Sequence, residues 1–244
     1  MLEQTIKVAF FLYFCKPFLF IIMERLIYNK FDKSSIARLP RAVFGGRIVV
    51  ITTAKEADKA VNFLLSQKIV GIDTETRPSF KKGQSRLVAL LQVATLDICF
   101  LFRLNLMGFT PAIVKFLEDK SVMKIGLSLH DDILSLHKRG EFKPENMIDL
   151  QNIVGKVGIK DLSLQKIYAN IFNEKISKTA QLSNWEADIL TDSQKLYAAT
   201  DAWACVMIYN ELERLMRDRC YKLVEVPDNE QTTDEQLETK EQNV

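Results

Sequence analysis

The 244-residue sequence has an ordinary globular composition, with 48% hydrophobic and 26% charged residues. These fractions exclude a collagen-like or wholly disordered chain, and the length suits one sizeable domain. The formal net charge is +2, but residues 225–244 contain seven acidic residues and one lysine, so residues 1–224 carry +8. A basic body is compatible with a polyanionic ligand and does not require one.

The four cysteines include no Cys-x-x-Cys pair, and only two histidines are present. This usage argues against a zinc site or a disulfide framework and favours a reducing compartment. We therefore expect a cytoplasmic protein.

The chain begins with an unusual apolar stretch. Residues 8–22 are almost wholly apolar and are interrupted by Lys16 and Pro17. Fifteen residues are fewer than the roughly 20 that span a bilayer as a helix, so we expect no stable membrane insertion. We interpret residues 1–22 as an upstream extension before Met23, with a membrane-associating leader as the alternative. Residues 23–224 would form the folded domain, and residues 225–244 a disordered acidic tail.

The rest of the chain alternates strand and helix patterns, which predicts one α/β domain. Short apolar runs predict strands at residues 47–51, 68–73, 86–95, 97–102, 122–126 and 147–149. Apolar residues at helical spacing predict helices at residues 54–66, 111–118, 129–138, 161–169 and 191–216, the last with Thr191 as its N-cap.

Two acids end a strand that should be buried. Asp73 and Glu75 are two residues apart, so their side chains project from the same face of the strand. Two like charges side by side are costly unless a cation lies between them. A strand that simply runs out into a solvated loop is the structural alternative.

Further acids stand in two predicted helices. Asp201 lies four residues after Tyr197 on a stripe of small and apolar side chains, where an unpartnered charge is costly. Asp131 and Asp132 open another helix, where capping and the helix dipole already favour acids. A cluster of carboxylates without His or Cys would select Mg²⁺ or Mn²⁺.

Taken in order, these acids resemble the three exonuclease motifs of the DnaQ-like superfamily. The motifs are Asp73-Thr74-Glu75, Asp132, and Tyr197-x-x-x-Asp201. The tyrosine is typical of the branch that contains ribonuclease D and the Werner-type exonuclease. Further similar segments are Leu182-Ser183-Asn184-Trp185, residues 190–204, Gln92 within Leu90–Ala94, and Lys124-Ile125-Gly126. The resemblance covers roughly residues 46–217.

The resemblance implies a ribonuclease H-like fold, a mixed sheet of about five strands flanked by helices, and two Mg²⁺ or Mn²⁺ ions. Asp73 would bridge both ions, Glu75 and Asp201 would complete the first site, and Asp132, rather than Asp131, would hold the second. Tyr197 would orient or help deprotonate the attacking water.

The expected substrate contacts are Thr74, Thr76, Arg77 and Trp185, although a packing role for Trp185 is equally compatible with the sequence. Asp149 is expected to be structural, and His130 and His137 to lie on the surface or in packing contacts.

The function implied is a 3′→5′ exonuclease that acts on nucleic-acid 3′ ends, with DNA favoured and DNA repair as a possible setting. A ribonuclease D-like exoribonuclease is the first alternative, because only contacts to the 2′-hydroxyl would differ. A nuclease-like domain that only binds nucleic acid or protein is the second.

Overall fold

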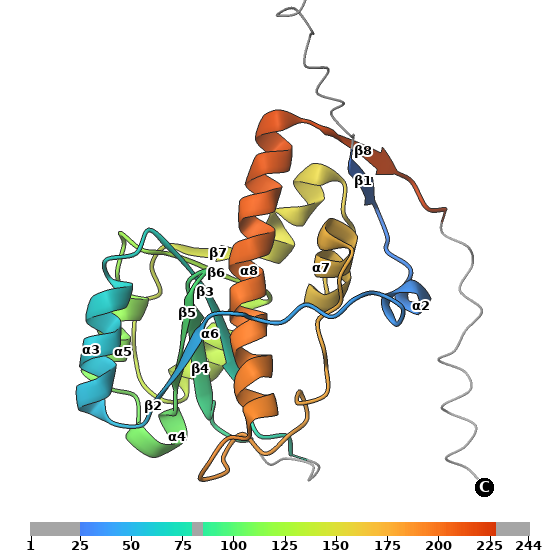
Figure 1. Cartoon of the computed structure of the whole chain (residues 1–244). Helices are drawn as coiled ribbons and strands as arrows, with labels where there is room; N and C mark the ends of the chain where they lie inside the picture. The colour runs from blue at the N-terminus through green and yellow to red at the C-terminus, as the bar shows by residue number, and fades with distance from the viewer. Residues whose placement is uncertain (1–24, 80–84, 228–244) are drawn as a thin grey trace, which may run out of the picture.

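The computed structural model describes residues 25–79 and 85–227, which form a mixed sheet with helices on both faces (Figure 1). The predicted leader at residues 1–22 and nearly all of the predicted tail lie outside these residues. Within the described ranges, the main sheet has six strands in the order β2-β5-β4-β3-β6-β7. The strands are β2 (Arg47–Ile51), β3 (Ile69–Glu75), β4 (Leu90–Ala94), β5 (Ile98–Phe102), β6 (Met123–Gly126) and β7 (Met147–Asp149).

The mixed character of the sheet comes from β4, which runs antiparallel to both β3 and β5, whereas the other pairs are parallel. All six strands coincide with predicted runs. The resemblance implied about five strands, and the sixth is the three-residue edge strand β7. Strands β4 and β5 form an antiparallel hairpin within two of these runs, although β4 begins at Leu90 and not at residue 86.

The helices lie in two layers. The described helices are α2 (Lys33–Ile36), α3 (Ala54–Leu64), α4 (Leu104–Met107), α5 (Pro111–Leu117), α6 (Leu129–His137), α7 (Leu164–Phe172) and α8 (Asp192–Asp218), with 3₁₀ turns η1 (Leu150–Asn152) and η2 (Val154–Val157). Helices α3 and α5 lie on one side of the sheet and α8 crosses the other (Figure 1). No helix in the described part of the chain is both long and apolar enough to cross a membrane.

Alternate residues along the strands face the two helical layers, as a period of two requires. Leu91 and Val93 of β4 belong to the apolar cluster with α3 and α5, whereas Leu90 and Ala94 pack in the cluster with α8. Gln92, between them, therefore faces α8. The same alternation in β3 sends Ile72 toward α3 and α5.

Close contact between β3 and α8 depends on small residues. A Cβ atom at Gly71 would lie 1.8 Å from the carbonyl oxygen of Ala202, which no side chain could tolerate. Ala198, Ala199 and Ala202 of α8 are fully buried against the sheet. Glycine at residue 71 thus sets the separation of the strand and the helix. Asp73 lies two residues beyond Gly71, and Asp201 directly precedes Ala202.

Helix α8 begins where the sequence predicts, whereas α7 begins three residues later than predicted. The Thr191 side chain accepts a hydrogen bond from the Gln194 backbone N–H, and the Gln194 side chain accepts one from the Thr191 backbone N–H, so the two form a capping box. The predicted helix at 161–169 begins at Leu164 instead, because the side chain of Ser163 caps its first turn.

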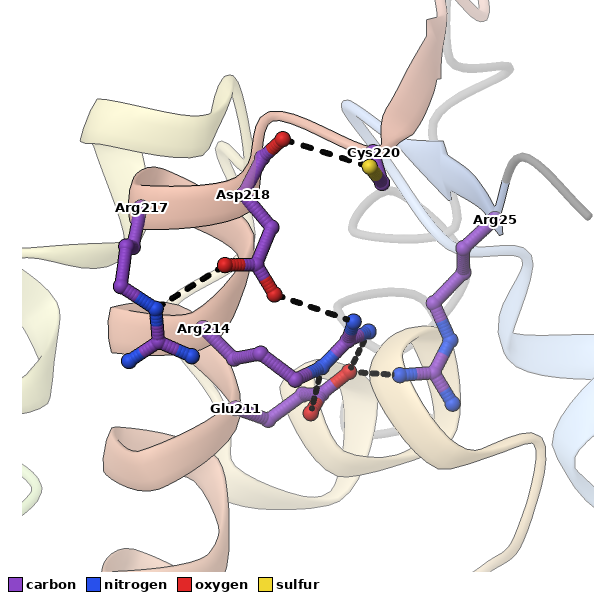
Figure 2. Close-up of polar contacts among 6 residues, drawn as sticks. All are labelled: Arg25, Glu211, Arg214, Arg217, Asp218 and Cys220. Carbon is purple, nitrogen blue, oxygen red and sulfur yellow. Dashed lines mark hydrogen bonds and ion pairs between the residues drawn. The ribbon is translucent and has the colours of Figure 1, made fainter. Parts of the chain in front are cut away.

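A small parallel ribbon joins the two ends of the described chain. Strands β1 (Arg25–Tyr28) and β8 (Tyr221–Val224) pair with each other outside the main sheet, and the sequence did not predict either. An ionic network ties β1 to the end of α8 (Figure 2). Arg25 and Arg214 both pair with Glu211, and Asp218 pairs with Arg214 at 3.7 Å.

Candidate active site

The first two acids stand side by side at the end of β3. Asp73 and Glu75 share the strand face toward α8, as their spacing predicts. Asp73 pairs with Gln92 across the antiparallel ladder, and Glu75 pairs with Leu90. The strand continues through both acids, so the alternative of a strand that ends in a solvated loop is wrong.

The third acid comes from α8. Asp201 is 7% exposed, and one carboxylate oxygen from each of Asp73, Glu75 and Asp201 lies within 4.8 Å of the others. One Asp201 oxygen, Oδ1, has no hydrogen-bond partner among the described residues. A buried carboxylate oxygen without a donor, next to two further carboxylates, is the arrangement that a hard divalent cation satisfies.

Asp132 stands next to this group, in the first turn of α6. Its Oδ1 accepts a hydrogen bond from the Thr74 hydroxyl, which links it to the residue between Asp73 and Glu75. Its charge also raises the pKa values of Asp73 and Glu75. Asp131, by contrast, is exposed. The structure therefore brings Asp132, and not Asp131, next to the three clustered acids.

Burial and mutual repulsion make these acids hard to ionise. Burial, reinforced by the charges of Asp201 and Asp132, raises the pKa of Glu75 to about 9. Burial raises the pKa of Asp201 to about 7, although a hydrogen bond from Tyr197 and the charge of Lys178 oppose the rise.

The pKa values of the other two acids, Asp132 and Asp73, are also raised. Burial raises the pKa of Asp132 to about 6, against the hydrogen bond from Thr74, and burial with three neighbouring carboxylates raises that of Asp73 well above its usual value. Bound cations would remove this repulsion, so the residues fit a divalent metal site.

Tyr197 is 8% exposed and lies one helical turn before Asp201. Burial, with the charges of Asp201 and Glu75 and a hydrogen bond to Asp201, raises its pKa far above the usual value of 10. The side chain is therefore a neutral phenol at physiological pH. Its ring packs 5.9 Å from that of Trp185.

Asp73, Glu75, Asp201 and Tyr197 line a cleft of about 380 Å³, and Thr74, the hydrogen-bond partner of Asp132, lines it as well. Part of its wall comes from residues that the sequence did not predict, namely Leu127, Ser128, residues 162–165, Ile176, Ser177, Lys178 and Gln181. Lys178 is exposed, so a cation lies at the rim of an acidic cleft. No local pattern identifies these wall residues, because they lie in loops and at the start of α7, which only the fold brings to α8.

The predicted substrate contacts fall into different environments. Thr76 is half-buried beside the cluster, and the Thr74 hydroxyl is already committed to Asp132. Arg77 pairs with Glu186 at 3.3 Å. Trp185 is 0% exposed, and its Nε1 donates to the Gln181 carbonyl. Such burial leaves no exposed ring face for a stacked base, and it favours the packing alternative for Trp185.

The remaining polar residues take structural positions. Asp149 accepts from the backbone N–H groups of Ser128 and Leu129, and so it stabilises the start of α6 as expected. His137 stacks on the ring of Phe142, with 4.4 Å between the ring centroids. His130 is exposed.

Comparison with known families agrees with this geometry. A family model described as 3′-5′ exonuclease matches residues 48–217, which is more than half of the chain. The chain belongs to the 3′-5′ exonuclease family. The matched segment contains β2 through most of α8, and therefore every acid of the cluster.

Relatives within this exonuclease family differ widely in length. The mouse bifunctional 3′-5′ exonuclease/ATP-dependent helicase WRN is 31% identical over 187 residues, which are 72% of this chain and 13% of the mouse protein. A 3′-5′ exonuclease of Arabidopsis thaliana is 29% identical over 210 residues, 77% of this chain and 72% of that protein. The chain thus spans only a small part of the mouse relative.

A solved structure gives the fold. Trypanosoma brucei RNase D in complex with RNA U12 matches with a TM-score of 0.60 at 20% identity, over 69% of this chain and 63% of that one. The predicted ribonuclease H-like class, a mixed sheet flanked by helices, is confirmed.

Proposed function

We propose that this chain is a metal-dependent exonuclease that removes nucleotides from nucleic-acid 3′ ends, and that DNA is its preferred substrate. The observation that carries the proposal is the convergence of Asp73, Glu75 and Asp201 within 4.8 Å, with Asp132 linked to them through Thr74. Family membership supports the reaction class. Retention of all four acids argues against a domain that only binds.

The carboxylates would hold two divalent ions. Asp73, at the centre of the group, would contact both ions, Glu75 and Asp201 would complete one site, and Asp132 would serve the other. When bound, such ions would supply a water of lowered pKa and stabilisation of the attacking and departing oxygens of the phosphodiester. Mg²⁺ and Mn²⁺ suit an all-oxygen ligand set.

Tyr197 would act on the attacking water. Because its hydroxyl is neutral, it can accept or donate a hydrogen bond at the edge of the cluster, one helical turn before Asp201. This supports orientation of the water as its main role. The hydroxyl of Tyr197 is attached to a buried ring, so its position is well defined.

The basic side chains of Lys178 and Arg77 would contact the phosphates of the bound strand. Lys178 lies at the rim of the cleft. Arg77 follows the acids of β3 by two residues, and its side chain is 41% exposed despite its pairing with Glu186. A phosphate could compete with Glu186 for this guanidinium, since Arg binds phosphate in two-point contacts.

The preference for DNA is supported by the similarity to the Werner-type exonuclease across 72% of the chain. The RNA-bound RNase D structure keeps exoribonuclease activity as the second candidate. We also propose a cytoplasmic location, supported by the free state of Cys99, Cys205 and Cys220 in the described part of the chain.

The test is digestion of matched 5′-labelled DNA and RNA strands with Mg²⁺, with Mn²⁺ and with EDTA. We expect a ladder of products shortened from the 3′ end that requires metal and forms faster on DNA. Asp73→Asn is the matched control and should give no ladder. Equal or faster shortening of RNA would refute the proposed preference for DNA. A ladder formed in EDTA would refute metal-dependent catalysis.

A further inference from the structure

Gln92 is a polar residue in an otherwise apolar strand. All five residues of β4, Leu90–Ala94, are buried, and Gln92 is 0% exposed. Its neighbours on the same face, Leu90 and Ala94, pack in the apolar cluster with α8. A leucine or methionine would fill such a position at lower cost, because a buried amide must satisfy both its donors and its acceptor.

The amide of Gln92 is only partly satisfied. Its Nε2 donates to Asp73 Oδ2 over 3.3 Å, and the two residues are direct partners in the β3–β4 ladder. Its Oε1 is buried and has no hydrogen-bond partner among the residues that the structure describes. Gln92 therefore lowers the stability of the fold. The side-chain hydrogen bond that it does make goes to a carboxylate of the candidate metal site.

Two of the four acids are each held by a neutral donor. Thr74 donates to Asp132, and Gln92 donates to Asp73. A neutral donor fixes the direction of a carboxylate without cancelling the negative charge that attracts a cation. A lysine or arginine at the same place would pair with the acid and compete with the metal.

We propose that Gln92 is a positioning residue for the metal site: its amide fixes the orientation of Asp73, one of the carboxylates that would hold the metal. The bond to Oδ2 restrains rotation of the carboxylate, and its place in the strand ladder makes the donor rigid. This inference rests on the proposed metal-binding role of Asp73. Groups that hold metal ligands in place typically affect metal affinity or activity by about 10–100-fold.

The test compares Gln92→Met with Leu91→Met in the full chain. Methionine keeps the length of glutamine but has no donor. Leu91 is equally buried, but it faces α3 and α5, so its variant reports on packing alone. Direct Mn²⁺ binding by calorimetry, the melting temperature in EDTA, and the Mg²⁺ concentration for half-maximal nuclease rate are measured for each protein.

We expect Gln92→Met to weaken Mn²⁺ binding by about 10–100-fold and to raise the Mg²⁺ requirement in parallel. Its metal-free melting temperature should equal or exceed that of the wild type, because the unsatisfied Oε1 is gone. Leu91→Met should leave Mn²⁺ affinity unchanged. Unchanged Mn²⁺ affinity in Gln92→Met would overturn the proposal, and so would weaker binding accompanied by a marked fall in the metal-free melting temperature.

Separate outcomes test the metal site and the positioning role of Gln92. If Asp73→Asn binds Mn²⁺ and cuts nucleic acid as the wild type does, the proposed metal site is wrong and Gln92 has no ligand to position. If Asp73→Asn loses both properties and Gln92→Met keeps both, the site stands and the positioning role is rejected.

Discussion

Asp201→Asn should abolish nuclease activity while stabilising the metal-free protein. The substitution keeps the shape of the side chain and removes one negative charge from a group of acids within 4.8 Å of one another. Most buried polar substitutions destabilise a protein. A gain in stability would therefore be diagnostic of a carboxylate that is kept for metal binding.

The size of the gain follows from the raised pKa. Asp201 titrates at about 7 in the folded protein, against a usual value of 3.8. At about 1.4 kcal/mol for each pKa unit, this difference sets a ceiling of roughly 4 kcal/mol on the cost of its charge at pH 8. Because the neighbouring acids share the repulsion and Asn loses part of the bond to Tyr197, we expect about 1–2 kcal/mol.

The gain should depend on pH in a definite direction. A raised folded-state pKa means that the folded protein binds more protons than the unfolded chain, so stability falls as pH rises between the two values. Below pH 3.8 Asp201 is protonated in both states and its charge costs nothing. The difference between Asp201→Asn and wild type should therefore be small near pH 4 and fully developed by pH 8.

The assay is thermal unfolding in EDTA at pH 4, 6 and 8. For a folded region of this size, about 1 kcal/mol corresponds to roughly 2–4 °C in melting temperature. The matched control is Asp131→Asn, since Asp131 is exposed in the first turn of α6 and its charge should be worth only about 0.3–1 kcal/mol in favour of the helix. A lower melting temperature for Asp201→Asn at pH 8 would show that Asp201 is a structural acid, and the reasoning would fail.

Three further predictions concern the chemistry of the cleft. Tyr197→Phe should lower the turnover rate by roughly 10²–10⁴ with Mg²⁺ affinity and melting temperature retained; unchanged turnover would leave Tyr197 as a packing residue. In EDTA the wild type should lose stability as pH rises from 5 to 9, because the pKa of Glu75 is raised to about 9, and saturating Mg²⁺ should remove most of that loss; a flat profile would contradict the cluster's repulsion. Arg77→Ala should raise KM for nucleic acid and reduce the salt slope of binding by about one, whereas Arg217→Ala, at the far end of α8, should do neither; equal effects of the two would indicate nonspecific charge attraction.

Local periodicity predicted which residues of the site share a strand or helix face. Asp73 and Glu75 share a strand face because successive side chains alternate, and Tyr197 and Asp201 share a helix face because they are four residues apart. The cap at Thr191 also follows from neighbouring residues alone. These relations span a few residues, so the printed sequence contains all the information that they require.

Local sequence patterns predicted least where the interacting residues are distant in the chain. Strands β1 and β8 are short and pair Arg25 with Tyr221, so neither carries a pattern strong enough to be predicted alone. The sequence left open whether Trp185 stacks on a substrate base or packs in the core, and only its contact with Tyr197 and its complete burial favour packing.

The convergence of the acids was decided by tertiary packing. The sequence places Asp73 and Asp201 on separate elements 128 positions apart, and their distance depends on how closely α8 approaches β3. Gly71 permits that approach because any Cβ there would meet the Ala202 carbonyl oxygen at 1.8 Å. The choice of Asp132 over Asp131 likewise rests on which carboxylate the hydroxyl of Thr74 can reach. The sequence determined which faces bear the acids, and long-range packing of the helix on the sheet decided that they share one site.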